Sequence, residues 1–234
     1  MSSSTRGQAP EPTPKTGGRD RSNSRGEATR LLLLEKAEEL FAHRGISAVP
    51  LRDIGTAAGQ KNNVVVQYHF GDRERLIREI AAYRGRLSEQ VRVELLADLF
   101  ATGRSPRVAD LVRAWIRALS CHLEADNFYL AFLSRYVIER GGYVGLEGME
   151  ISNTIYTFTS MLRRLLPTHP GTLLDERWMV MMTSAVHTLA RYQTSLRAGG
   201  LPAPLPRLVA DLVVLFAAAL EAPPAGIDVG VEAG

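Results

Sequence analysis

Residues 51–80 read LRDIGTAAGQKNNVVVQYHFGDRERLIREI, and this stretch decides the fold. Its first part is a short amphipathic helix, because the apolar Leu51 and Ile54 fall on one side and Gly59 ends the pattern. A second segment follows at once, but its three valines at 64–66 fit a strand as well as a helix by propensity alone. Short helices separated by a glycine turn are typical of a helix-turn-helix, so the pattern favours that motif and leaves the valine segment open.

The helix before this stretch is predicted to begin at Ser24, because Ser24 and Glu27 have the spacing of a capping box. Gly45 is placed to end that helix in the left-handed conformation. Residues 1–23 are rich in Ser, Gly, Pro and charge and show no apolar periodicity, so we expect a disordered N-terminal tail there. Residues 223–234 are expected to form a second loose tail.

Beyond residue 71 the sequence predicts long helices and no strand. Glycine and proline separate apolar-periodic segments at about residues 72–101, 106–124, 127–140, 145–166, 172–198 and 205–221. We therefore predict an all-α protein of about nine helices. A three-helix head at residues 24–71 is expected to precede a larger helical body at residues 72–222.

Composition and missing motifs narrow the function. The formal net charge of +3 is too small to indicate nucleic-acid binding by itself. The single cysteine, Cys121, excludes an internal disulfide and, with no signal peptide, predicts a reducing cytoplasm. No apolar run approaches the roughly 20 residues of a membrane-spanning helix, so no membrane partner is expected.

Catalytic signatures are also missing from the sequence. It contains no Gly-x-Ser-x-Gly, no phosphate-binding glycine loop and no His-Glu-x-x-His. None of the five histidines forms a helical i,i+4 pair that could bind a metal. We expect no enzyme activity, no cofactor and no metal site.

A spaced set of residues over positions 29–80 resembles a known family motif. The matching residues are Ala37, Leu40-Phe41 and Gly45, then Leu51-Arg52-Asp53-Ile54 and Ala57-Ala58-Gly59, then Tyr68-His69-Phe70, and finally Arg73-Glu74-x-Leu76. With these residues the chain resembles the DNA-binding head of the TetR family of bacterial regulators. The resemblance implies that the three valines lie on the recognition helix, with Val66 and Phe70 facing inward.

The resemblance also implies which side chains meet DNA. Tyr68 and His69 would hold the phosphate backbone, and Arg73 replaces the lysine usual in that role. Asparagine can pair with adenine, lysine can reach guanine, and a valine methyl can touch a thymine methyl. The expected DNA-binding residues are Arg25, Lys61, Asn62, Asn63, Val64, Gln67, Tyr68, His69 and Arg73.

Three departures from the family pattern leave the operator sequence undetermined. Val49-Pro50 stand where the family usually has a serine or threonine cap for the second helix. The segment between Gly59 and His69 is one residue longer than the commonest form, and Gln67 replaces an aromatic residue.

The body offers bulky side chains that either fill a core or line a cavity for an apolar or aromatic effector. The candidates are Trp115, Phe128, Phe132, Tyr136, Phe158, Met161, Trp178, Met181 and Met182. His122 and His187 are candidates for polar contacts or for structural histidines.

The family analogy implies a homodimer through the helices at about 172–198 and 205–221, although these faces can also be buried within one subunit. The predicted function is a repressor that binds a palindromic operator as a dimer and is released by its ligand. Two alternatives stay open: a ligand-dependent activator or corepressor-type regulator, and a helical interaction protein without DNA binding. Burial or mutual pairing of Lys61, Asn63, Tyr68 and Arg73 would favour the last.

Overall fold

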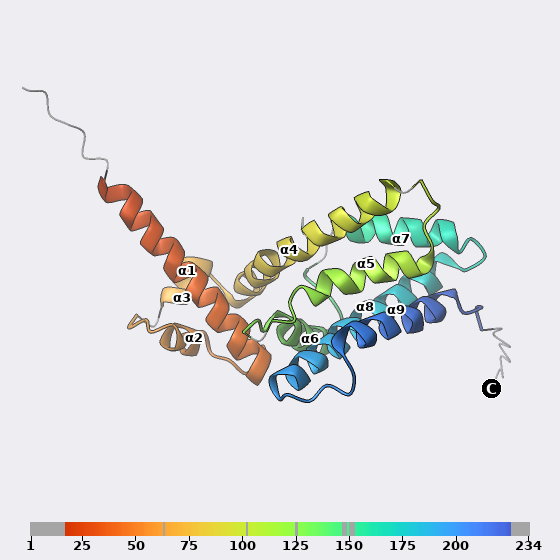
Figure 1. Ribbon diagram of the computed structural model, residues 1–234. Helices are drawn as coiled ribbons and strands as arrows, with labels where there is room; N and C mark the ends of the chain where they lie inside the picture. The colour runs from red at the N-terminus through yellow and green to blue at the C-terminus, as the bar shows by residue number, and fades with distance from the viewer. Residues whose placement is uncertain are drawn as a thin grey trace, which may run out of the picture.

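The computed structural model describes residues 17–62, 64–101, 103–124, 126–146, 149 and 153–225. Within these ranges the chain forms nine helices and no strand (Figure 1), which confirms the all-α prediction. The helices are α1 (Gly17–Arg44), α2 (Leu51–Ala57), α3 (Val65–Phe70), α4 (Arg73–Ala101), α5 (Val108–Ser120), α6 (Tyr129–Arg140), α7 (Asn153–Leu165), α8 (Gly171–Arg197) and α9 (Leu205–Glu221).

The first helix starts earlier than the sequence pattern predicted. It begins at Gly17, so residues 17–23, which were assigned to a flexible tail, belong to α1. Extending an existing helix adds one hydrogen bond for each residue ordered, and this segment contains no proline to stop it. In Figure 1 this end of α1 projects away from the rest of the protein. The remaining parts of the predicted tails, residues 1–16 and 226–234, lie outside the described residues.

Val65 and Val66 are helical and buried as expected, whereas Val64 lies in the turn just before α3. Val66 and Phe70 are each only 1% exposed, in a core shared with α1, α2 and the start of α4. The close approach of α2 and α3 depends on Gly55, because a Cβ there would lie 3.1 Å from Val65 Cγ1. Burial of one side of α3 therefore overrides the strand propensity of its valines.

The fourth helix connects the head to the body (Figure 1). Asp72 caps its first turn, because Asp72 Oδ1 accepts a hydrogen bond of 2.7 Å from the backbone N–H of Arg75. Farther along, α4 packs against α5 and α7, while α6 packs between α1 and α8. One helix thus begins beside the recognition helix and runs along the body against α5 and α7.

Two body helices are shorter than predicted. The α5 helix ends at Ser120 instead of residue 124, and α7 begins at Asn153 instead of residue 145. Gly145 has a φ of +87°, a conformation that a right-handed helix cannot contain. In the described part of the chain, no helix is both long and apolar enough to cross a membrane.

Candidate DNA-binding surface and ligand cavity

A turn built from side-chain and backbone hydrogen bonds positions α3. Gly59 takes a φ of +68°, and Asn62 Oδ1 accepts a hydrogen bond of 3.1 Å from the backbone N–H of Val64. The carbonyl of Asn62 also accepts a bond of 3.2 Å from the N–H of Val65, the first residue of the helix. Asn62, predicted to contact DNA, thus also shapes the start of the recognition helix.

The outer side of α3 and the turn just before it present side chains that nothing in the described structure covers. Tyr68 is 83% exposed and Val64 is 53% exposed, and Lys61 and Gln67 are exposed as well. Neither the Lys61 ammonium nor the Gln67 amide is hydrogen-bonded to another described residue. Large exposed apolar side chains next to polar ones are typical of a binding surface. Asn63, another predicted contact, lies outside the described residues.

His69 is half-buried beside this surface, with its ring against Tyr68 at 5.1 Å between centroids. Burial, and then the positive charge of Arg30, lowers the pKa of His69. The ring is therefore neutral at neutral pH and can still donate one N–H. Arg25 is exposed on α1, well before the turn that leads to α2.

Arg73 does not point away from the head as the predicted phosphate contact requires. Its Nη1 donates a hydrogen bond to the carbonyl of Ile46, and its guanidinium lies 5.9 Å from the ring centroid of Phe41. The side chain is half-buried, because it bridges the start of α4 to the turn after α1. In this structure Arg73 holds the head together.

The same turn is held from the body by Glu139 of α6. The carboxylate accepts hydrogen bonds from the N–H of Ile46 at 2.8 Å, the N–H of Ser47 at 3.0 Å and Ser47 Oγ at 2.8 Å. Although burial raises it, these bonds bring the pKa of Glu139 below its ordinary value. Gly45 has a φ of +90°, and a Cβ there would lie 2.8 Å from Glu139 Oε1, so a larger residue would break the contact.

A second carboxylate joins head and body at the other end of α6. Glu38 of α1 is 2% exposed and accepts hydrogen bonds from Arg84 Nε at 2.7 Å and from the N–H of Phe128 at 3.0 Å. Burial raises the pKa of Glu38, and the positive charge of Arg84 opposes that shift. The two carboxylates therefore fix α6 along α1 at both ends of the body helix.

A cavity of about 260 Å³ lies in the body and is lined by six of its segments. Its described lining residues are Ala81, Gly85, Ser88, Arg92, Trp115, Leu119, Tyr129, Leu133, Tyr143, Leu146, Ile155, Tyr156, Met179 and Met182. Trp115 and Met182 were predicted to line a cavity, and both do. The walls are mostly aromatic and aliphatic, as in most small-molecule sites.

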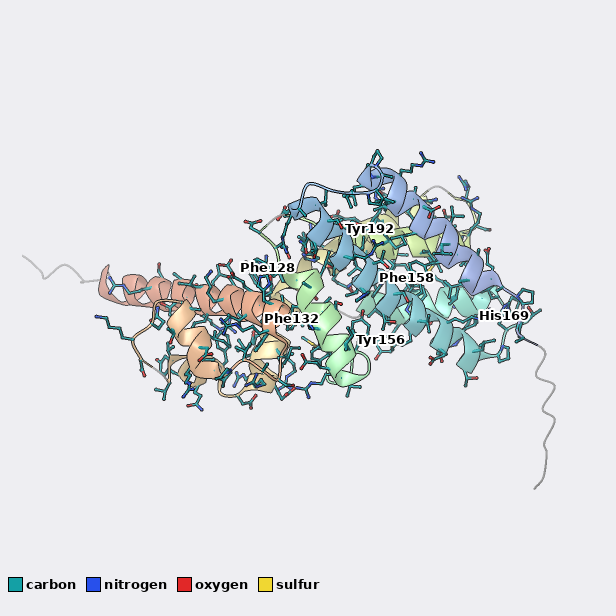
Figure 2. The ribbon with its side chains drawn as sticks, turned by 90° about the horizontal axis from the view of Figure 1, so that it is seen from below. Phe128, Phe132, Tyr156, Phe158, His169 and Tyr192 are labelled. Atoms are coloured by element: carbon teal, nitrogen blue, oxygen red, sulfur yellow. The ribbon has the colours of Figure 1, made fainter. Side chains whose placement is uncertain are left out.

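The other predicted ligand residues do not line this cavity. They are Phe128, Phe132, Tyr136, Phe158, Met161, Trp178 and Met181. Phe132 stacks on Phe41 of the head at 6.2 Å, and Arg197 lies 4.4 Å over the ring of Phe128. Figure 2 accordingly shows Phe128 and Phe132 on the side of the body that meets α1. Phe158 stacks on Trp178 at 5.8 Å, so these large side chains fill the core.

One wall of the cavity comes from α4, and sequence reasoning missed it. Ala81, Gly85, Ser88 and Arg92 recur at helical spacing on a single face of that helix. Glycine inside a helix costs about 1 kcal/mol relative to alanine. A buried mid-helix Gly85 was therefore the available signal that this face needs space.

Arg92 is only 4% exposed, and other side chains hold it in place. Its Nη2 donates to Glu89 Oε2 at 2.6 Å, its Nε donates to Thr154 Oγ1 at 2.7 Å, and its guanidinium lies 5.1 Å from the Trp115 ring centroid. The positive charge at the cavity wall is thus balanced by a carboxylate.

Helices α8 and α9 expose apolar side chains on the outside of the body. Val180 is 53% exposed, Val214 is 68% exposed and Leu215 is 57% exposed. Leu212 and Phe216 of α9 are instead buried in their own subunit. Part of the predicted interface face therefore packs internally, while Val180, Val214 and Leu215, together called the apolar strip below, stay exposed.

These features define an all-helical protein with a helix-turn-helix whose outer side is exposed and with a long fourth helix that lines a cavity in the body. Residues 33–80 match the protein family described as "Bacterial regulatory proteins, tetR family". Residues 33–80 therefore carry a DNA-binding domain of the TetR type, which supports a TetR-like DNA-binding transcriptional regulator. No curated protein matches the chain.

Proposed function

We propose that the protein is a homodimeric repressor that binds a palindromic operator and releases it when an apolar or aromatic small molecule enters the cavity. The observation that carries this proposal is the course of α4, whose first residue, Arg73, bonds to the head while Ala81, Gly85 and Ser88 line the cavity. A ligand against α4 therefore touches the helix that positions the head. The cytoplasmic location and the absence of enzyme activity stay predictions.

The recognition side of α3 supports the DNA-binding role of particular residues. Lys61, Val64 and Gln67 are exposed and can reach base edges, while Tyr68 can donate its hydroxyl to a phosphate. Exposure of Lys61 and Tyr68 counts against an interaction protein without DNA binding, whereas the bonded, half-buried Arg73 does not, and Asn63 lies outside the described residues. Arg73 is given a positioning role because its guanidinium is already hydrogen-bonded within the head.

The apolar strip on α8 and α9 supports the homodimer. Val180, Val214 and Leu215 expose apolar surface that a second copy would remove from water, at about 25 cal/mol per Å² buried. Two heads joined in this way can occupy successive major grooves when their recognition helices lie about 34 Å apart. The body would then set the spacing of the heads.

Ligand control follows from two connections between the cavity and the head. The cavity walls include Gly85 and Ser88 of α4 and Tyr129 and Leu133 of α6. The α6 helix holds the turn after α1 through Glu139, as described above. A ligand that prefers another arrangement of α4 and α6 would weaken DNA binding by its differential affinity for the two arrangements.

The first experiment is a selection of the purified protein against random duplex DNA at about physiological salt, where non-specific phosphate binding is weak. Recovery of a palindrome supports a dimeric regulator and supplies its operator. The absence of any enriched sequence would count against the repressor proposal and in favour of a regulator that needs its ligand to bind.

The recovered operator then tests the reading surface. Lys61→Ala combined with Tyr68→Ala should lower operator affinity about a hundredfold, since each lost contact is worth about 1–3 kcal/mol. Arg164→Ala removes the same positive charge from the exposed surface of α7 and should leave affinity nearly unchanged. Equal affinities of the double variant and the wild type would overturn the assignment of α3.

A further inference from the structure

We propose that the cavity takes an uncharged aromatic molecule with one hydrogen-bond acceptor, and that the Ser88 hydroxyl donates to that acceptor. The inference rests on the proposed ligand control and specifies the chemistry of the ligand. It follows from the hydrogen bonds behind Ser88, the charge balance at the wall and the aromatic lining.

The hydrogen bonds behind Ser88 begin at Asn127. Its Oδ1 accepts the backbone N–H of Tyr129 at 2.9 Å, which fixes the orientation of the side-chain amide. The amide nitrogen Nδ2 therefore faces Nδ1 of His122, at 3.3 Å. Because an amide NH₂ group can only donate, Nδ1 of His122 must be the acceptor and carries no proton.

His122 is fully buried, and this sets its charge. Burial, and then the positive charges of Arg84 and Arg92, lowers the pKa of His122 to about 4. At neutral pH the ring is neutral, so its single proton is on Nε2. Nε2 lies 2.8 Å from Ser88 Oγ and donates to it.

Ser88 thereby accepts from His122 and keeps its own hydrogen to donate. Its side chain is 3% exposed and lines the cavity. The nearby alternative acceptor is the Cys121 sulfur: burial raises the pKa of that thiol, and a hydrogen bond from Ser88 partly offsets the rise. A thiol sulfur is a weak acceptor, so a ligand oxygen in the cavity would replace it.

Neighbouring residues hold His122, the hydrogen-bond partner of Ser88, in place. Gln193 of α8 donates to the carbonyls of His122 and Asn127, at 2.8 and 2.7 Å. These bonds fix the loop that carries the histidine, so little ordering would be lost when a ligand binds. A ligand without an acceptor would leave the buried Ser88 hydroxyl with only its weak hydrogen bond to the Cys121 sulfur.

The charges and aromatic rings of the cavity wall indicate the charge and shape of the ligand. The cationic Arg92 is matched by Glu89, so a ligand anion would have to displace a carboxylate that already has its partner. A buried charge without such a partner is costly, which favours an uncharged ligand. The walls include Trp115, Tyr129 and Tyr143, whose ring faces suit a flat aromatic compound.

Three matched probes test the proposal: naphthalene, 2-acetylnaphthalene and 2-naphthoate. Their affinities would be measured by calorimetry, and the emission of the protein's two tryptophans would confirm binding at the cavity, since Trp115 lines it. The ketone should bind about tenfold more tightly than naphthalene, because a net hydrogen bond is worth about 1 kcal/mol or slightly more. The carboxylate should bind most weakly.

Ser88→Ala should remove the preference for the ketone and leave naphthalene binding at least as strong. Ser120→Ala is the matched control, because the Ser120 hydroxyl donates to the carbonyl of Ile116 at 2.8 Å and does not line the cavity. Circular dichroism would verify that both variants fold. Tightest binding of the carboxylate, or a ketone preference that survives in Ser88→Ala, would overturn the proposal.

The same probes separate this inference from the proposed function. If they bind in the expected order and leave operator affinity unchanged, ligand release is wrong and the cavity chemistry stands. If they release DNA with no dependence on Ser88, the cavity chemistry is wrong and ligand release stands.

Discussion

Polar side chains are exposed around the recognition helix, whereas those at the cavity wall are buried and hydrogen-bonded. Lys61, in the turn before α3, and Tyr68, on α3, stand in solvent without a hydrogen-bond partner among the described residues. At the cavity, Ser88, His122 and Arg92 are nearly fully buried, and neighbouring residues orient each of them. DNA is highly charged and its interfaces with proteins contain bridging waters, so the side chains that bind it need not be oriented beforehand. A small ligand offers few contacts, so its donors must be oriented beforehand.

The largest expected effect is a loss of operator affinity caused by substitutions in the body, outside the DNA-binding head. Val180→Asp with Val214→Asp places charges on the apolar strip of the body, far from α3, and should give a monomer. Operator affinity should then fall about a thousandfold, within the 10²–10⁴ gain that two linked sites provide. Analytical ultracentrifugation and DNA titration would measure both.

Val93→Asp is the control for this change, because Val93 is 51% exposed on α4 and lies outside the strip. It should leave the oligomeric state and the operator affinity nearly unchanged. A double variant that stays dimeric would show that the strip on α8 and α9 is not the interface.

A smaller effect tests the buried histidine of the cavity. His122 has a pKa lowered from 6.5 to about 4, so between these values the unfolded chain takes up a proton that the folded chain does not. Its contribution to stability is therefore complete above pH 6.5 and is lost as the pH falls toward 4. From about pH 7 to about pH 5 the loss should be about 2 kcal/mol.

The measurement compares urea unfolding of the wild type and of His122→Gln at both pH values. The difference between the two proteins isolates the histidine from the other titrating groups. Identical pH dependence in the two would mean that the pKa of His122 is the same in the folded and the unfolded chain, so that burial does not lower it.

The smallest expected effect concerns Glu139, which joins the body to the turn between α1 and α2. Glu139→Gln cannot accept the bonds of Ile46 and Ser47 at both oxygens, so the turn before α2 should be held less firmly. Operator affinity should fall about tenfold with the dimer intact, because a hydrogen bond to a charged group is worth about 1.5–3 kcal/mol.

Glu74→Gln provides the matched control, since Glu74 forms an exposed ion pair with Arg140 and exposed pairs are worth about 0–1 kcal/mol. Equal losses in both variants would indicate a general effect of charge. No loss in Glu139→Gln would mean that α4 alone sets the position of the head.

The head could be predicted from the sequence because its signals are local. Gly45, Gly59 and the apolar spacing of the short helices each act within a few residues. Even there, the valine segment was decided by burial against other helices. The orientation of Arg73 toward Ile46 also depends on a contact between residues distant in the chain, so exposure could not be judged from the motif.

The body shows the opposite balance. Periodicity predicted the body helices. Phe158 and Trp178 were predicted as ligand-binding residues because they are bulky and aromatic, but they pack on each other in the core. The cavity instead lies along Gly85 and Ser88, whose small side chains leave room. Size alone cannot separate a core residue from a wall residue, because the distinction depends on what the facing helices leave empty.

The residues proposed to read DNA came from the resemblance to the TetR family, whereas the sequence pattern by itself determined the all-helical class and the short helices of the head. Those properties follow from backbone preferences and from periodicity within single helices. Only the tertiary structure decided the cavity, the bonding of Arg73 and the protonation of His122. Each of these depends on residues brought together from several helices, whose burial and hydrogen bonds exist only in the folded chain.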